Sequence, residues 1–294
     1  MKQFSHILAA TDFSGPAHHA VQRAAKASRE TGAALTLLHV IQPPPLEIVR
    51  QLWSESATLS ENEALDAARK KIVDLAATLS ERHQVSAGTR IVSGSFLSEL
   101  STEADAAAAD LVVCGDSGED AVQHLLLGST VERIIGNVRR PVLVVKRQAH
   151  ERYRSVLVAV DFSPASLRSI TQARALAPDA EFVLLHAFEA PFAEKLKNAE
   201  VDENALKHYR ASARKEAAKR LHALSDEAGL PTETTRFSVL QGDPLRRILE
   251  HEQRHNVDLI VLGKRGQSLL EALMIGSVTR RIVARSRCDV LVSV

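Results

Sequence analysis

Short apolar runs alternate with longer amphipathic stretches along the whole chain, and the series occurs twice. The runs are 7–10, 35–40, 89–92, 111–114 and 142–145 in the first half, and 157–160, 182–187, 237–240, 259–262 and 290–294 in the second. Runs of this length, rich in β-branched residues, are typical of buried strands. The longest stretches with a helical period are 57–83 and 202–227. Each half therefore predicts strand and helix in strict alternation, which is typical of a parallel, doubly wound α/β sheet with helices on both faces.

A similar turn leads from the first strand of each half into a helix. The strand ends in Asp-Phe-Ser, with Asp12 in the first half matching Asp161 in the second. Ser14 and Ser163 are expected to be N-cap residues, since a serine hydroxyl accepts a hydrogen bond from the first helical turn. We expect the helices at 17–30 and 165–176.

A glycine motif follows the fourth apolar run of each half. The first copy is Gly115-x2-Gly118-x9-Gly128-Ser129, and the second, 148 residues later, is Gly263-x2-Gly266-x9-Gly276-Ser277. Glycines at a strand-to-helix junction let a phosphate approach the backbone, and a helix N-terminus adds N–H groups that favour an anion. The spacing is neither that of a Walker A loop nor that of the Gly-x-Gly-x-x-Gly dinucleotide turn. The motif predicts a phosphate site in each half, although a duplication copies structural glycines as faithfully as functional ones.

The repeat also sets the domain organisation and limits the classes of partner. We expect domains at 1–147 and 155–294, joined by a linker at 148–154. Basic and acidic residues nearly cancel, 37 against 36, which argues against nucleic-acid or membrane-surface binding driven by a basic field. No apolar run approaches the roughly 20 residues of a membrane helix. Two distant cysteines and the lack of a signal peptide predict a cytoplasmic protein.

The strand ending in Asp, the strand ending in His-Val or His-Ala, the glycine motif and the valine-rich last strand together resemble the universal stress protein family, in its tandem, nucleotide-binding form. The resemblance covers nearly the whole chain. It implies two flavodoxin-like (adenine nucleotide alpha hydrolase-like) domains, each a five-stranded parallel sheet of order 3-2-1-4-5. It places ATP, or ADP or AMP, at the switch point between the first and fourth strands.

The resemblance also assigns residues to the nucleotide. In the first domain they are Asp12, Val40, Gly115, Gly118, Gly128, Ser129 and Thr130. In the second they are Asp161, Ala187, Gly263, Gly266, Gly276, Ser277 and Val278. The aspartates would lie beside the ribose and phosphates, and Val40 and Ala187 at the adenine edge. For the aspartates a second interpretation stays open, an Asx turn that only leads into the helix.

The two predicted sites differ in charge. After its first glycine the first copy carries Asp116, followed by Glu119 and Asp120, whereas the second carries Lys264 and Arg265. At about 4 Å, each like-charge contact costs on the order of 1 kcal/mol even in a water-like dielectric, and opposite charges gain a similar amount. We therefore expect tighter binding in the second domain. Mg²⁺ held by Asp12 or Asp116 would offset the repulsion in the first, and a solvated loop is the alternative for Lys264 and Arg265.

Other polar residues are expected to have structural roles. His39 and His186 end matching strands and are predicted to pack there with a satisfied ring nitrogen. Cys114 is interpreted as a small apolar residue, whereas cations beside Cys288 suggest an oxidisable thiol. Asp289 stands where the first half has Pro141, which leaves the start of the last strand undecided.

Three functions fit these patterns. The favoured one is an adenine-nucleotide-binding module of stress response or signalling. The second is a slow ATPase that uses the same loops with a divalent metal; no nucleophile elbow, paired carboxylate or zinc motif points to another enzyme. The third is a scaffold with one degenerate site. The resemblance further implies that the last strands pair with each other as an intramolecular pseudo-dimer, and it leaves open a homodimer of whole chains.

Overall fold

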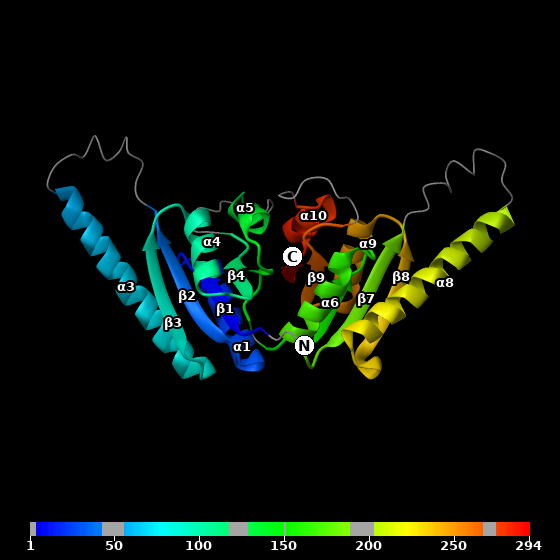
Figure 1. Cartoon of the computed structure of the whole chain (residues 1–294), viewed down its shortest axis with the longest axis horizontal. Helices are drawn as coiled ribbons and strands as arrows, with labels where there is room; N and C mark the ends of the chain where they lie inside the picture. The colour runs from blue at the N-terminus through cyan, green and yellow to red at the C-terminus, as the bar shows by residue number, and fades with distance from the viewer. Residues whose placement is uncertain (1–3, 43–55, 118–128, 150, 189–202, 267–274) are drawn as a thin grey trace. The chain divides into compact units, whose positions relative to one another are not determined.

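The computed structural model describes residues 4–42, 56–117, 129–149, 151–188, 203–266 and 275–294 (Figure 1). The chain divides into two compact units, Met1–Arg152 (unit 1) and Tyr153–Val294 (unit 2). None of the helices in the described ranges is long and apolar enough to cross a membrane.

Unit 1 is a five-stranded sheet with helices between the strands. Its elements are β1 (His6–Ala10), α1 (Gly15–Thr31), β2 (Ala34–Ile41), α3 (Ser56–His83), β3 (Ala87–Ser93), α4 (Phe96–Ala106), β4 (Leu111–Gly115), α5 (Ser129–Asn137) and β5 (Val142–Val145). The strands are parallel and ordered β3-β2-β1-β4-β5. This is the predicted 3-2-1-4-5 order, which is confirmed.

Unit 2 repeats the arrangement. Its elements are β6 (Ser155–Ala159), α6 (Pro164–Leu176), β7 (Glu181–Phe188), α8 (Glu203–Ala228), a 3-10 turn η1 (Thr232–Thr234), β8 (Thr235–Gln241), α9 (Pro244–His255), β9 (Leu259–Gly263), α10 (Ser277–Arg285) and β10 (Asp289–Ser293). The parallel order β8-β7-β6-β9-β10 is again 3-2-1-4-5.

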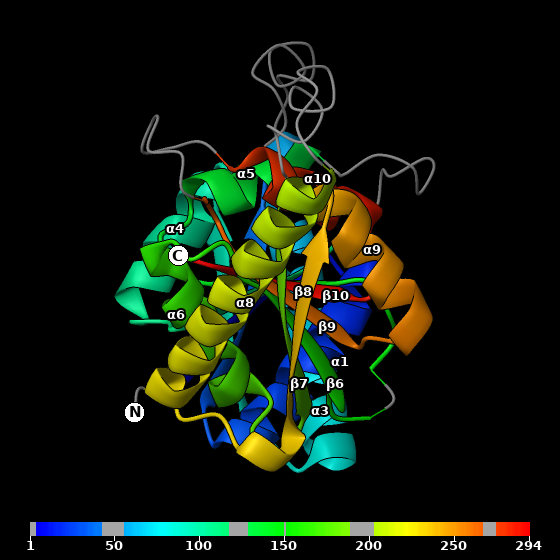
Figure 2. The ribbon, with the colours of Figure 1, turned by 90° about the vertical axis from the view of Figure 1, so that its right-hand side faces the viewer.

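Helices cover both faces of each sheet, as predicted. In unit 1, α1 packs beside α3 and α4 beside α5; in unit 2, α6 packs beside α8 and α9 beside α10. Figure 2 shows α8 and α9 on opposite sides of β8. The central strands are continuous apolar runs because both faces are covered; Leu259, Ile260 and Val261 of β9, for example, have no exposed surface.

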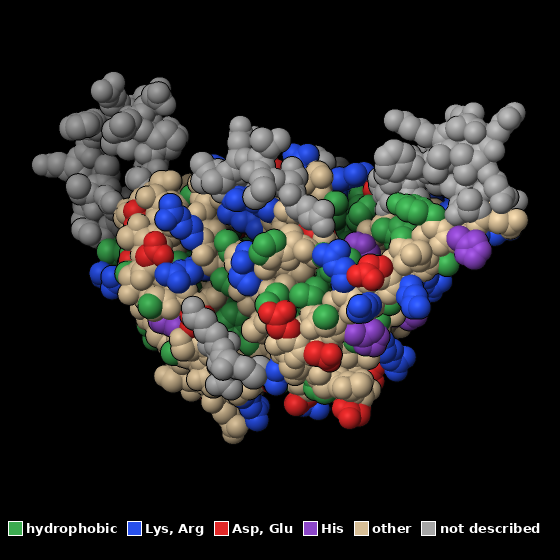
Figure 3. All heavy atoms as spheres, turned by 45° about the vertical axis from the view of Figure 1, so that its right-hand side comes forward, with side chains coloured by type: hydrophobic (Ala, Val, Ile, Leu, Met, Phe, Trp, Pro, Cys, Tyr) green, Lys and Arg blue, Asp and Glu red, His purple; other side chains and the backbone are tan. Residues whose placement is uncertain are grey.

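The long helices α3 and α8 turn charged residues to solvent. Arg69 to Lys71 on α3 and Arg214 and Lys215 on α8 are exposed, as the sequence predicted. Figure 3 shows basic and histidine side chains along α8. These charges therefore belong to solvated faces of the two helices.

Helix α1 has its predicted N-cap but starts at Gly15, two residues earlier than predicted, and α6 begins with a difference. Ser14 caps α1, and its hydroxyl oxygen accepts a hydrogen bond from Ala17 N at 3.3 Å. Ser163 occupies the N-cap position of α6, but its side chain makes no capping hydrogen bond. The neighbouring Asp161 Oδ1 instead accepts the Ser166 hydroxyl at 2.9 Å, so a different side chain organises this turn.

The last strand of unit 2 starts one residue earlier than predicted. Asp289 belongs to β10 and is only 2% exposed. A carboxylate is costly to bury without a partner, and here the Tyr153 hydroxyl donates to Asp289 Oδ2 at 2.7 Å. That bond allows an aspartate to open a buried strand at the position where unit 1 has Pro141.

Both cysteines are buried. Burial, with a smaller contribution from Asp116, raises the pKa of the Cys114 thiol to about 12, so its interpretation as a small apolar residue is confirmed. The prediction of an oxidisable Cys288 was wrong. Its side chain has no exposed surface, because the entry to β10 packs under α9, whose Glu252 accepts the Cys288 N–H at 2.8 Å.

Candidate functional site

A cavity of about 400 Å³ lies in unit 2 at the carboxyl ends of β6, β7 and β9. It takes in eight of the nine residues that the sequence proposed for the second site: Asp161, Ala187, Gly263, Arg265, Gly266, Gly276, Ser277 and Val278. Cavities that hold small ligands have volumes of roughly 300–1,000 Å³. The structure thus brings the predicted residues together in a space of ligand size.

The Asp161 carboxylate makes the Asx turn that was one of the two interpretations left open by the sequence; a contact with the nucleotide stays a prediction. Oδ1 accepts the Ser163 N–H at 2.9 Å, which makes an Asx turn into α6. Oδ2 faces the glycine loop, since a Cβ built on Gly266 would lie 2.6 Å from it. Oδ1 therefore holds the turn into α6, and Oδ2 lies toward Gly266 in the glycine loop.

The glycines of the motif are required for different reasons. A Cβ on Gly263 would lie 2.8 Å from the Ala165 Cβ, so this glycine lets β9 end against the first turn of α6. A Cβ on Gly276 would meet nothing closer than the Lys264 carbonyl oxygen at 3.4 Å. Gly263 is thus needed for packing, whereas Gly276 leaves room in the cavity at the start of α10.

The N-terminus of α10 forms one wall of the cavity. Gly276 is the N-cap residue, and Ser277 is the first helical residue. The Ser277 side chain is exposed and lines the cavity, so it does not cap the helix. Thr279, which the sequence did not single out, also lines the cavity and donates its hydroxyl to the Gly263 carbonyl oxygen at 2.8 Å. The first N–H groups of a helix favour an anion at this position.

Arg265 and Lys264 differ in where their side chains lie. Arg265 lines the cavity, whereas Lys264 does not and is only 7% exposed. Burial, and secondarily the charge of Arg265, lowers the pKa of Lys264. The backbone of Lys264 closes the loop: its N–H donates to the Ser293 carbonyl oxygen at 2.7 Å, and its carbonyl oxygen accepts the Gly276 N–H at 2.9 Å. Of the two predicted cations, Arg265 is the one at the cavity.

The cavity also has apolar lining residues that the sequence did not single out, called the apolar wall from here on. It consists of Ala159, Leu185, Pro244, Ile248, Leu262 and Ile275. Pro244 and Ile248 come from α9, one helical turn apart. A signal was present in the sequence, since Asp243-Pro244 after a Gly turn marks a helix start at a strand's carboxyl end.

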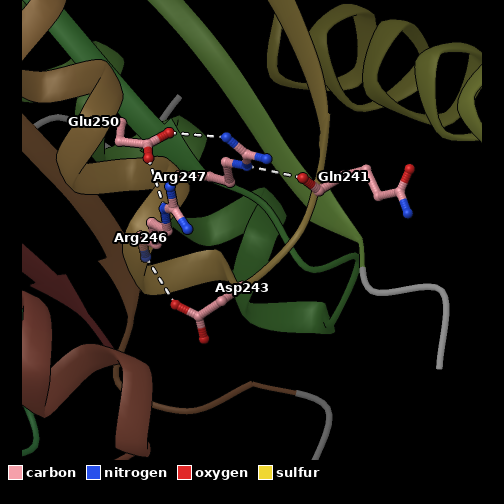
Figure 4. Close-up of polar contacts among 5 residues, drawn as sticks. All are labelled: Gln241, Asp243, Arg246, Arg247 and Glu250. Atoms are coloured by element: carbon pink, nitrogen blue, oxygen red, sulfur yellow. Dashed lines mark hydrogen bonds and ion pairs between the residues drawn. The ribbon is translucent and has the colours of Figure 1, made fainter. Parts of the chain in front are cut away.

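A polar network holds the start of α9 in place (Figure 4). Asp243 caps the helix and accepts the Arg246 N–H at 2.8 Å. Arg247 donates to the Gln241 carbonyl oxygen at 2.8 Å and pairs with Glu250 at 2.8 Å. Glu250 also pairs with Arg246 at 2.7 Å, and these bonds lower the pKa of its carboxyl group. The network fixes the helix turn that carries Pro244 and Ile248 of the apolar wall.

The corresponding edge of unit 1 is built differently. Asp12 makes the same Asx turn, with Ser14 N–H donating to Oδ1 at 2.9 Å, but its side chain is exposed. Val40, one residue before the end of β2, is half-buried. Gly115 ends β4 against Pro16, whose carbonyl carbon would lie 2.9 Å from an added Cβ. Ser129 and Thr130 begin α5, whereas Gly118 and Gly128 lie outside the described residues.

A cavity of about 380 Å³ in unit 1 contains only one of the predicted residues. Thr130 lines it together with Gln42, Ser95, Phe96 and Arg133, whereas Asp12, Val40 and Gly115 do not. The position corresponding to Arg265 is Ser117, whose hydroxyl donates to Asp116 Oδ1 at 3.0 Å. Of the predicted residues that the structure describes in unit 1, Thr130 is therefore the one at this cavity.

The two strand-end histidines have the predicted structural role. His39 Nδ1 lies 2.8 Å from the Thr11 carbonyl oxygen, and His186 Nδ1 lies 2.8 Å from that of Val160. No group of three metal-binding side chains occurs among the residues described. Mg²⁺ held by Asp12 or Asp116 stays a prediction.

Comparison with known proteins identifies the family. The model of the universal stress protein family matches twice, at residues 3–146 and 152–293. The chain belongs to the universal stress protein family. A universal stress protein of Mycolicibacterium smegmatis is 27% identical over 304 residues, covering 97% of this chain and 96% of the relative. Universal stress protein YxiE of Bacillus subtilis is 31% identical over 148 residues and matches 48% of this chain.

Solved structures agree with the fold of a tandem universal stress protein. A universal stress protein of Archaeoglobus fulgidus superposes with a TM-score of 0.72 at 17% identity, and the match covers 99% of this chain and 98% of that one. A putative universal stress protein of Pseudomonas aeruginosa gives a TM-score of 0.62 at 18% identity. At such identities the likeness concerns the fold alone.

Proposed function

We propose that unit 2 of this universal stress protein binds an adenine nucleotide, with ATP as the first candidate, and that the chain acts as a nucleotide-dependent stress-response or signalling module. One observation supports this most: a single cavity joins an apolar wall, a carboxylate, an arginine and a glycine loop at a helix N-terminus. A nucleotide has the matching parts, since its base is flat and apolar on its faces, its ribose donates hydroxyl hydrogens, and its phosphates are anionic.

Each part of the nucleotide has a counterpart in the cavity. We place the base against Pro244 and Ile248, with its edge at Ala187 near the end of β7; all three residues line the cavity. Asp161 Oδ2 accepts a ribose hydroxyl. The phosphates lie at Gly276 and Ser277, where backbone N–H groups of α10 favour an anion. Arg265 adds an attraction of about 1 kcal/mol in a water-like dielectric, and more where water is excluded.

The experiment has two parts. Mass spectrometry of the ligand released from purified full-length protein is expected to find an adenine nucleotide. Calorimetric titration with ATP, ADP, AMP and GTP is expected to favour the adenine nucleotides. No released nucleotide together with no heat of binding for any of the four would contradict the proposal.

Gly276→Ala provides the matched variant. An added Cβ meets no atom closer than 3.4 Å, so the fold is expected to tolerate it. The methyl group nevertheless occupies space where a phosphate would approach the backbone, so ATP affinity is expected to fall about tenfold. An unchanged affinity would show that the phosphates do not reach this glycine.

A further inference from the structure

We propose that Phe162, held by His186 and Arg220, is a positioning residue that aims the Asp161 carboxylate into the unit 2 cavity. The proposal rests on the nucleotide function proposed above. Phe162 directly follows Asp161, and its φ is 63°. The left-handed region is sparsely populated by residues with a Cβ, and a bulky aromatic side chain is an outlier there. Such a backbone persists only where the surroundings hold it.

His186 holds the residues on both sides of Asp161. Its ring centroid lies 4.3 Å from that of Phe162, and its Nδ1 lies 2.8 Å from the Val160 carbonyl oxygen. Burial lowers the pKa of His186, and the charge of Arg220 adds to this, while the Val160 hydrogen bond and Asp161 oppose it. The neutral ring therefore donates Nδ1–H to the carbonyl before Asp161 and packs against the aromatic ring after it.

Arg220 contacts Phe162 from a different element. It lies on α8, and its guanidinium carbon is 4.0 Å from the Phe162 ring centroid. That distance is well inside the roughly 6 Å range of a cation–π contact. Phe162 is thus held by a strand-end histidine and by a helix arginine, which together oppose the relaxation of its backbone.

The orientation of the carboxylate follows from this turn. Asp161 Oδ1 accepts the Ser163 N–H and the Ser166 hydroxyl, each at 2.9 Å. With Oδ1 occupied in this way, Oδ2 is the oxygen that faces Gly266. A rotation of the Phe162 backbone would move the Ser163 N–H and release the carboxylate from its present direction.

Unit 1 repeats the turn with a weaker hold. Phe13 has a φ of 67°, its ring lies 4.5 Å from that of His39, and His39 Nδ1 lies 2.8 Å from the Thr11 carbonyl oxygen. The cation is Lys71, with its Nζ 5.7 Å from the Phe13 centroid. Asp12 is exposed, whereas Asp161 is half-buried. The same backbone conformation therefore occurs at this turn in both units, and the closer cation belongs to unit 2.

The test uses the full-length chain and Phe162→Gly. Glycine can adopt a φ near 63° but is not confined to it, so the fold is expected to tolerate the variant while the ring contacts that hold the turn in this conformation are lost. Misaiming of Oδ2 is expected to weaken ATP binding about tenfold. Arg220→Ala is expected to weaken it about threefold through the lost cation–π contact, and Arg220→Lys to restore most of that loss. The matched variants Phe13→Gly and Lys71→Ala are expected to leave the unit 2 affinity unchanged.

A second measurement needs no nucleotide. Hydrogen exchange of the Ser163 amide reports its bond to Asp161 Oδ1, and Phe162→Gly is expected to lower its protection about tenfold relative to wild type, after correction for intrinsic rates. Wild-type protection in Phe162→Gly would overturn the proposal, whether or not ATP binds. Lost Ser163 protection in a protein whose wild type binds no nucleotide would support the positioning role and contradict the nucleotide function alone.

Discussion

The two units share one fold and differ in the side chains at the same sheet edge. In unit 2 Arg265 lines the cavity and Arg247 lies over Gly242; the matching residues in unit 1 are Ser117 and Glu99, whose carboxylate lies over Gly94. The backbone frame, including the left-handed phenylalanine, is kept in both. The comparison teaches that the same strand-to-helix frame is kept in both units while the charged side chains at its edge differ, and we propose that these charges decide which unit binds an anion.

The largest expected effect tests whether the first motif glycine is structural in both units. Gly263→Ala places a Cβ 2.8 Å from the Ala165 Cβ and 2.9 Å from the Arg265 carbonyl oxygen, and Gly115→Ala places one 2.9 Å from the Pro16 carbonyl carbon. Overpacking of this kind costs about 2–3 kcal/mol. Urea unfolding of the full chain should show a similar loss for both variants and little loss for Gly276→Ala. If only one of the two variants lost stability, the first motif glycine would not have the same structural role in both units.

The second prediction exchanges the charge at the cavity. Arg265→Glu replaces an attraction by a repulsion of similar size, so ATP affinity should fall by about 2 kcal/mol, or roughly 30-fold. Arg265→Lys keeps the charge and should retain most of the affinity. Ser117→Arg, the reciprocal change in unit 1, should strengthen any ATP binding there. Calorimetry at two salt concentrations checks the origin of the effect, because an effect that does not weaken with salt would not be electrostatic.

A third difference concerns pH. Burial, with smaller contributions from His255 and Arg254, lowers the pKa of His251 on α9 to about 4. The matching residue in unit 1 is Glu103, which pairs with Arg90 at 2.9 Å. Between pH 6.5 and 4, His251 becomes protonated in the unfolded chain but stays neutral in the folded chain. The free energy of unfolding therefore falls as the pH falls. After allowance for solvent screening of this half-buried ring, the loss is about 1 kcal/mol.

His251→Gln measures that loss directly. The drop in urea midpoint between pH 7.5 and pH 5 should be smaller in the variant than in wild type. It should not vanish, because burial also lowers the pKa of His186 and of His83. An equal drop in both proteins would show that His251 titrates normally in the folded chain.

The smallest effect concerns the buried lysine. Because Lys264 contributes its backbone to the loop and its side chain does not line the cavity, Lys264→Met should change ATP affinity less than about twofold. Calorimetric titrations of Lys264→Met and Arg265→Lys with ATP compare the effects of the two adjacent residues on affinity. A fall as large as that of Arg265→Glu would mean that the ammonium group reaches the phosphates.

The sequence predicted the architecture well because it depends on periodic patterns. The helix layers and the starts of α5 and α10 follow from the apolar runs and from the glycine motif, whereas the strand order was implied by the resemblance to the universal stress protein family. Side-chain directions were harder to predict. Lys264 and Arg265 are adjacent, and only the closure of the loop onto Gly276 decides which of them faces the cavity.

Two further features could not be predicted from the sequence, because they depend on contacts between residues far apart along the chain. The apolar wall includes Pro244 and Ile248, whose helix is held by the Arg247 bond to Gln241. Phe162 has a left-handed backbone conformation that a phenylalanine rarely adopts. It is held there by residues from β7 and α8. Local propensity cannot report a conformation that tertiary contacts impose.

The most direct test of the central claim is an ATP titration of three full-length proteins: wild type, Gly276→Val and Gly128→Val. The account predicts that Gly276→Val removes the tight phase of ATP binding and that Gly128→Val keeps it. ATP should therefore bind to Gly276→Val about 30-fold more weakly than to Gly128→Val, because two charge contacts of about 1 kcal/mol each separate the two sites. Retention of tight binding in Gly276→Val together with its loss in Gly128→Val would contradict the account.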